Sequence, residues 1–195
     1  MRNVTTTGKR FAAVLASIML LGSVPGVAGD IKGDALGAIH QRTAAQYANV
    51  RHMIPGELSA LRTKAPNKVL LLDVREPAEH AVSHLAGAVR VSPALTAEEF
   101  TRTFANTLKG RTVVLYCSVG VRSSRLASRV QATARKAGAM AVYNLAGGVF
   151  NWHNQSRPLT SSAGRTDRIH PYNWRWSRLL ERRSLISYKP PGETQ

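Results

Sequence analysis

Cys117 is the only cysteine in the 195-residue chain, and it stands where the apolar run at 112–116 gives way to small residues and an arginine. A cysteine that serves only packing is expected within such a run, whereas one at its end can meet solvent and substrate. Because the chain offers no second cysteine, Cys117 cannot form an intrachain disulfide. It is therefore either an inert buried residue or a free reactive thiol.

The residues after Cys117 indicate why its sulfur would be reactive. A helix is predicted at 122–137, and the unpaired N–H groups and positive dipole at its start stabilise a thiolate or another anion. Gly120 allows the loop to fold with its amides inward, and Arg122 adds a positive charge that can hold an anionic oxygen. The alternative is a small hydrophobic cysteine at a strand end. We predict a nucleophilic Cys117 in a loop formed by Ser118, Val119, Gly120, Val121, Arg122 and Ser123.

The elements around this loop alternate between strand and helix. The continuous apolar run at 69–74 is typical of a strand buried on both faces of a parallel sheet. Thr96 and Glu99 have the spacing of a capping box, which predicts a helix that ends at Lys109. The alternation predicts an α/β domain with a mainly parallel sheet, in which Cys117 lies at the carboxyl end of a strand, where ligands bind. Further strands are expected at 52–54, 88–91, 112–116 and 139–145, and further helices at 35–47, 57–64, 122–137 and 149–155.

Three separated stretches, at 70–93, 113–127 and 145–159, together resemble a single rhodanese domain. The family's pattern is matched at Asp73, Arg75, Glu79, His84, Gly87, Gly147, Gly148 and Trp152. The resemblance implies a parallel central sheet with helices on both faces. It also implies a sulfurtransferase in which Cys117 takes the outer sulfur of an anionic donor such as thiosulfate. The persulfide then passes its sulfur to an external acceptor, cyanide or a thiol, since the chain carries no resolving cysteine.

The length of the loop separates this chain from related phosphatases. The loop from Cys117 to Arg122 has the form Cys-x4-Arg, whereas the phosphatases that resemble this fold use Cys-x5-Arg, a wider cradle for phosphate. The shorter loop matches the sulfur-handling members. Arg122 in the sixth place leaves oxyanion chemistry with arsenate or phosphate as a residual alternative.

Other marked residues are expected to support the site. In the family, residues at the positions of Asp73 and Arg75 form an internal ion pair near the loop, which favours support of the loop over substrate contact. His84 is expected to be a hydrogen-bonded structural residue, and His153 a surface residue. One cysteine and scattered histidines predict no metal site, and no nucleotide-binding fingerprint or other cofactor motif is present.

The N-terminus has the pattern of a secretory signal peptide. Arg2, Lys9 and Arg10 precede an uncharged apolar stretch at 11–24, and small residues follow it. We predict cleavage after Ala28, and hence a periplasmic or secreted protein. Because the apolar stretch is short for a span of about 20 residues, an uncleaved membrane anchor is the less favoured alternative.

Charge and composition suggest an acidic partner. The chain has 27 Lys and Arg against 11 Asp and Glu, a formal net charge of +16, which suits an anionic substrate, an acidic protein or a membrane surface. Nucleic acid is not expected, because the basic residues are scattered and do not form a stripe. The alternative to an enzyme is a non-catalytic binding module on the same scaffold.

The predicted organisation comprises a signal peptide at 1–28, an extension at 29–54, a rhodanese domain at 55–159 and a basic tail at 160–195. The tail contains Trp174 and Trp176, and one short helix is expected at 174–183. We expect the tail's aromatic residues to pack on the domain; the alternative is a tail that docks an acidic protein or a membrane surface.

Overall fold

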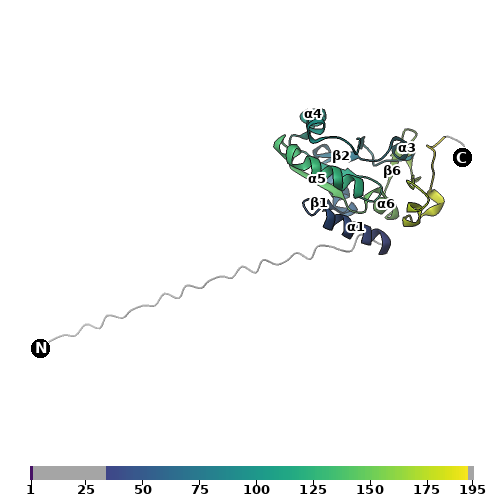
Figure 1. Ribbon diagram of the computed structural model, residues 1–195, viewed down its shortest axis with the longest axis horizontal. Helices are drawn as coiled ribbons and strands as arrows, with labels where there is room; N and C mark the ends of the chain where they lie inside the picture. The colour runs from purple at the N-terminus through teal and green to yellow at the C-terminus, as the bar shows by residue number, and fades with distance from the viewer. Residues whose placement is uncertain (2–33, 193–195) are drawn as a thin grey trace.

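The computed structural model describes residue 1 and residues 34–192, so the predicted signal peptide lies outside the described residues. A five-stranded sheet forms the centre of the molecule (Figure 1), with the strand order β1-β5-β4-β2-β3. All four pairings are parallel, as the alternation of strands and helices predicted. The strands are β1 (Arg51–Met53), β2 (Val69–Asp73), β3 (Val89–Arg90), β4 (Thr112–Tyr116) and β5 (Ala141–Leu145).

Six α-helices accompany this sheet in the described part of the chain. The predicted capping box is confirmed, since Thr96 accepts the Glu99 amide at 3.1 Å and Glu99 accepts the Thr96 amide at 2.9 Å. Among these helices, none is long and apolar enough to span a membrane. The helices are α1 (Asp34–Gln46), α2 (Pro55–Lys64), α3 (Pro77–Val82), α4 (Ala97–Leu108), α5 (Val121–Lys136) and α6 (Gly148–Asn154).

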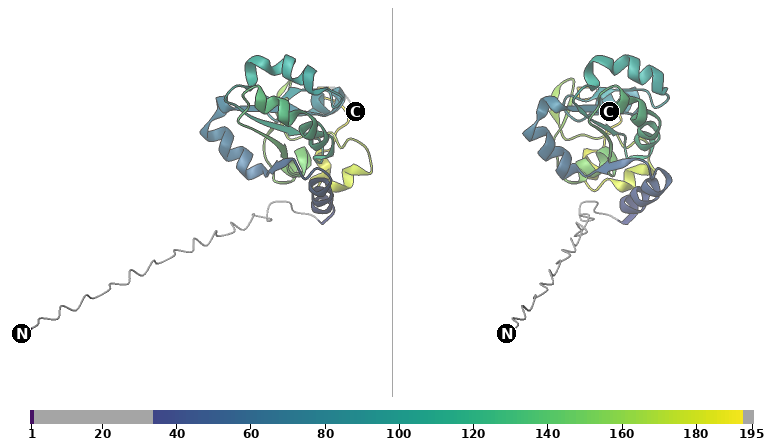
Figure 2. Two further views of the ribbon diagram at one scale, coloured as in Figure 1. Left: turned by 60° about the vertical axis from the view of Figure 1, so that its left-hand side comes forward. Right: turned by 90° about the vertical axis from the view of Figure 1, so that its left-hand side faces the viewer.

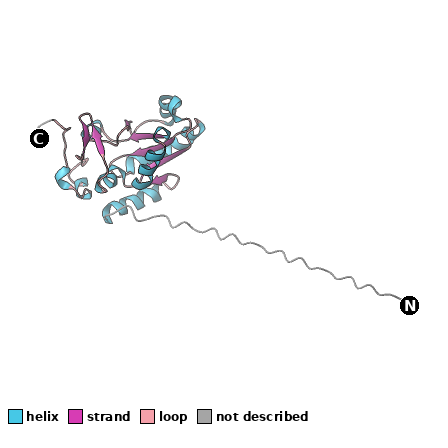
Figure 3. Ribbon diagram, turned by 180° about the vertical axis from the view of Figure 1, so that it is seen from behind, coloured by secondary structure: helices cyan, strands magenta, loops and turns pink. Residues whose placement is uncertain are grey.

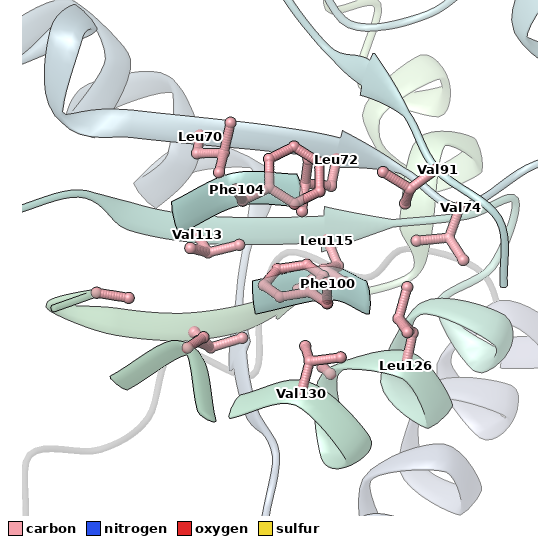
Figure 4. Close-up of a cluster of buried hydrophobic side chains, with 14 of the residues drawn as sticks. Leu70, Leu72, Val74, Val91, Phe100, Phe104, Val113, Leu115, Leu126 and Val130 are labelled. Atoms are coloured by element: carbon pink, nitrogen blue, oxygen red, sulfur yellow. The ribbon is translucent and has the colours of Figure 1, made fainter. Parts of the chain in front are cut away.

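Helices cover both faces of the sheet, as expected (Figure 2). Along β2 and β4, alternate side chains point to opposite faces. Leu70, Leu72, Val113 and Leu115 pack against α4 and α5 (Figure 4), whereas Leu71, Val114 and Tyr116 pack with residues of α2 and α6. Burial on both faces explains why these strands are apolar throughout.

The C-terminal segment, defined as residues 156–192, packs beside α6 (Figures 1 and 3) and contains little regular structure. It begins with an antiparallel hairpin of β6 (Leu159–Ser161) and β7 (Gly164–Thr166). The helix predicted at 174–183 is wrong: two short 3-10 turns, at Trp176–Leu179 and Arg183–Leu185, occupy this region. The side chain of Leu180 is buried against the domain, and that long-range contact outweighs the local helical pattern.

His153 is fully buried, so its predicted surface position is wrong. The C-terminal segment covers it: the His153 Nε2 lies 3.0 Å from the Asp167 carbonyl oxygen, and Arg182 donates to the His153 carbonyl at 2.8 Å. Sequence reasoning missed this because the covering residues are distant along the chain. His153 therefore anchors the C-terminal segment to α6.

We expect His153→Gln to reduce the loss of stability in mild acid. Burial, and then the charge of Arg182, lowers the pKa of His153 to about 4, against about 6.5 in an unfolded chain. The unfolded state therefore binds more protons between these two values, and the wild type loses stability as the pH falls through this window. The glutamine variant should lose about 2 kcal/mol less between pH 7 and pH 4.5, measured by urea unfolding. Parallel pH profiles for the two proteins would contradict the prediction.

Candidate active site

The predicted catalytic loop follows β4 and leads directly into α5. Gly120 is the residue before the helix and has a positive φ of 96°, a backbone conformation that glycine adopts at little cost. Its amide donates to the Cys117 sulfur at 3.2 Å. Cys117 is almost completely buried. The Cys117 sulfur thus faces a backbone amide at the start of α5.

Helix α6 holds the catalytic loop from behind. The Val149 amide donates to the Cys117 carbonyl oxygen at 2.9 Å, and the Phe150 amide donates to the Ser118 carbonyl oxygen at 3.0 Å. The backbone approaches the loop so closely at Gly148 that a Cβ atom there would lie 2.7 Å from the Ser118 carbonyl carbon. The absence of a side chain at Gly148 therefore permits the contact that fixes the loop.

The structure pairs Arg122 with Glu79. Two hydrogen bonds of 2.8 Å join the guanidinium to the Glu79 carboxylate, and the Ser118 hydroxyl donates to the same carboxylate at 2.6 Å. Burial alone would raise the pKa of Glu79, but the hydrogen bonds from Arg122 and Ser118 lower it. The sequence predicted that the positive charge of Arg122 would hold a substrate anion. In the structure, the Glu79 carboxylate offsets that charge. Sequence reasoning missed this role of Glu79, which lies on α3, a helix that no pattern predicted.

Asp73 and Arg75 form an ion pair with no exposed side-chain surface, with 2.7 Å between Arg75 Nη2 and Asp73 Oδ2. Although burial would raise the pKa of Asp73, the charge of Arg75 holds it well below its usual range. The Tyr116 hydroxyl donates to Asp73 at 3.1 Å, so the pair holds the residue next to Cys117. Because both side chains are completely buried, the pair cannot contact a substrate. It supports the end of β4 through Tyr116.

Ser123 also faces away from the pocket. Its hydroxyl donates to the Asn144 side chain on β5 at 2.6 Å. The Asn144 amide nitrogen lies 3.2 Å from His52 Nδ1 on β1. Ser123 thus ties the start of α5 to the sheet, whereas Ser118, Val119, Val121 and Arg122 line a pocket beside Cys117.

A pocket of about 140 Å³ has Cys117 in its lining. One wall is the catalytic loop, and the other is formed by Tyr172 and Trp176 of the C-terminal segment. No sequence motif connects these two aromatic residues to Cys117. The sequence feature that could have indicated them is the cluster of one tyrosine and two tryptophans within a basic stretch. The lining residues are Cys117, Ser118, Val119, Val121, Arg122, Tyr172 and Trp176.

Comparison with known proteins agrees with the resemblance noted in the sequence. The chain is 34% identical over 115 residues to the probable adenylyltransferase/sulfurtransferase MoeZ of Mycobacterium tuberculosis, a match that covers 59% of this chain and 28% of that protein. It is 38% identical over 87 residues to the uncharacterized protein YqhL of Bacillus subtilis, with 44% of this chain and 61% of that protein covered. The matched part therefore spans less than two thirds of either relative.

Among solved structures, the thiosulfate sulfurtransferase from Pseudomonas aeruginosa has a similar fold, with a TM-score of 0.50 and 19% sequence identity. The similarity covers 75% of this chain and 26% of that chain. The family model described as the Rhodanese-like domain matches residues 54–155, just over half of the chain. The chain therefore belongs to the rhodanese-like domain family.

Proposed function

We propose that the protein is a sulfurtransferase that carries sulfane sulfur as a persulfide on Cys117. The observation that carries this proposal is the position of the Cys117 sulfur. It is the one thiol of the chain, it receives a hydrogen bond from the Gly120 amide at 3.2 Å, and it lines a pocket above the loop. The similarity to a protein named as a probable adenylyltransferase/sulfurtransferase also supports sulfur transfer.

The first half-reaction loads the enzyme. The Cys117 thiolate attacks the outer sulfur of thiosulfate, a new S–S bond forms, and the S–S bond of thiosulfate breaks to release sulfite with its electron pair. The amide of Gly120 and the start of α5 favour the negative charge that the persulfide retains.

The second half-reaction unloads the enzyme. Cyanide attacks the outer sulfur of the persulfide, the S–S bond to Cys117 breaks, and thiocyanate leaves as the thiolate returns. A thiol acceptor follows the same course and leaves as its own persulfide. The six-residue loop supports this chemistry over phosphate transfer, because the related phosphatases use a loop that is one residue longer.

Intact mass spectrometry tests the proposal. The protein is incubated with thiosulfate, desalted and weighed, with Cys117→Ser in parallel. We expect the wild type to gain the mass of one sulfur atom, to lose it on addition of cyanide, and the serine variant to gain nothing. A reduced wild-type thiol that gains no sulfur from thiosulfate or from an organic persulfide would overturn the proposal and favour the binding-module alternative.

A further inference from the structure

The C-terminal segment is anchored firmly at the edge of the active site. The Asn154 side chain on α6 donates to the Leu179 carbonyl at 2.9 Å and accepts from the Glu181 amide at 3.1 Å. Ile169 is fully buried, and its backbone pairs with that of Leu185 and Ser187. Because α6 also binds the catalytic loop, one helix fixes both walls of the pocket.

Tyr172 has a backbone conformation that is uncommon for a residue other than glycine. Its φ is 67°, a left-handed conformation that is unfavourable for a residue other than glycine. Its amide donates to His170 Nδ1 at 3.0 Å, which fixes the turn. Its ring centroid lies 4.9 Å from the Arg122 guanidinium carbon and 6.3 Å from the Trp176 ring, edge to face. The turn therefore places an aromatic ring beside Arg122 of the loop.

The chemistry of the pocket is apolar. Its lining includes one charged side chain, Arg122, whose charge is offset by Glu79 and whose guanidinium faces the Tyr172 ring. Val119, Val121 and Trp176 supply much of the remaining lining, together with Cys117 and Ser118. A dianion such as thiosulfate gains little from such walls, and cyanide has no group to place against them.

The size of the pocket indicates what could fill it. The volume of about 140 Å³ is close to that of an apolar cavity of about 150 Å³ that holds benzene in another protein. Aromatic side chains also bury large apolar areas when a ring stacks on them. A benzene-sized group fits, provided that it is attached to the atom that reacts at Cys117.

We propose that Tyr172 and Trp176 form a subsite for the apolar organic body of the acceptor thiol, a group about the size of a benzyl side chain. This inference rests on the proposed sulfur transfer. The thiol sulfur attacks the outer sulfur of the Cys117 persulfide anion, and the S–S bond to Cys117 breaks. The Cys117 thiolate is restored, and the acceptor leaves as an organic persulfide that keeps the proton of the thiol. The C-terminal segment thereby decides which thiol receives the sulfur.

The test compares acceptors on the persulfide form of the full-length protein. After loading with thiosulfate and removal of sulfite, loss of sulfur from Cys117 is followed by intact mass with benzyl mercaptan, 2-mercaptoethanol or cyanide. We expect the wild type to react at least about tenfold faster with benzyl mercaptan than with 2-mercaptoethanol, since one methylene group in an apolar pocket is already worth about tenfold. Trp176→Ala should remove that preference, and Trp176→Phe should retain most of it.

Trp174→Ala provides the matched control. Trp174 is 60% exposed and contacts Arg175 and Arg178 without lining the pocket, so the preference should persist. An equal rate for both thiols in the wild type would overturn the subsite. An equal fall in the benzyl mercaptan and cyanide rates of Trp176→Ala would also overturn it, because general damage to the site lowers both.

A second readout does not depend on sulfur transfer. Alkylation of the Cys117 thiolate by benzyl chloride forms a C–S bond and releases chloride, and its rate is compared with that of iodoacetamide. The ratio of these rates should fall about tenfold in Trp176→Ala if the ring binds there. If no persulfide forms but this ratio falls, the proposed function fails and the aromatic subsite stands. If the ratio does not change, the subsite is refuted even when sulfur transfer is observed.

Discussion

Replacing Gly148 with alanine is expected to lower the rate of persulfide formation about 100-fold and the free energy of unfolding by about 3 kcal/mol. Gly148 has a positive φ of 60°, and the added methyl group would lie against the Cys117 carbonyl oxygen and 2.7 Å from the Ser118 carbonyl carbon. These atoms belong to the loop that aims the sulfur. Because backbone cannot rotate aside as a side chain does, either α6 or the loop must move.

Gly164→Ala separates the steric effect from the backbone effect. Gly164 also has a positive φ, 101°, but nothing lies within 4 Å of a Cβ atom built there. This control should cost about 1–2 kcal/mol and leave the rate of persulfide formation unchanged. Urea unfolding and the time course of the mass gain with thiosulfate measure the two effects. If Gly148→Ala behaves like Gly164→Ala in both, the close approach of α6 does not position the loop.

The elements that local patterns specify could be predicted from the sequence. The apolar runs at 69–74 and 112–116 became β2 and β4, and the Thr96–Glu99 capping box begins α4. The position of Cys117 followed from the same patterns, since a parallel strand that enters a helix leaves its carboxyl end at the ligand-binding edge. In such cases the pattern and its structural consequence lie within one element or one connection.

The features that sequence reasoning missed depend on contacts between distant residues. Glu79 meets Arg122, 43 residues away, through a six-residue helix too short to show a period. Trp176 reaches the pocket because Leu180 and Ile169 are buried against the domain. Local sequence cannot specify these packings, and the burial of His153 was missed for the same reason. The half of the candidate site that contains Cys117 was thus predictable, and the half formed by the C-terminal segment was not.

Breaking the buried ion pair of Asp73 and Arg75 is expected to cause a second large effect, a loss of stability. Arg75→Met should lower the free energy of unfolding by about 3–5 kcal/mol at pH 7, because it leaves the Asp73 carboxylate buried without its main partner. Two donors remain close to Asp73 Oδ2, His80 Nδ1 at 2.9 Å and the Tyr116 hydroxyl at 3.1 Å. They place the expected cost toward the lower end of this range.

The matched controls for Arg75→Met come from the neighbouring strand and from the pair itself. Arg90 on β3 pairs in register with Asp73, but its side chain is exposed, so Arg90→Met should change stability by less than about 0.5 kcal/mol. The double variant Asp73→Leu/Arg75→Met removes both charges and should recover much of the loss. A double variant as unstable as Arg75→Met would show that the cost comes from lost packing and not from an unpaired charge.

The pH dependence of stability tests independently whether the charge of Asp73 causes the loss of stability in Arg75→Met. In the wild type the pKa of Asp73 lies well below its usual range, so the pair stabilises the fold above the unfolded-state pKa of about 4. This stability is lost as the pH falls through the folded-state pKa. In Arg75→Met, burial without the arginine should raise the pKa of Asp73, so the variant loses stability as the pH rises above about 4. The difference between the two proteins must therefore be larger at pH 7 than at pH 4 in urea unfolding. A constant difference would mean that the charge of Asp73 does not matter, and that Arg75 supports Tyr116 and Cys117 only by filling space.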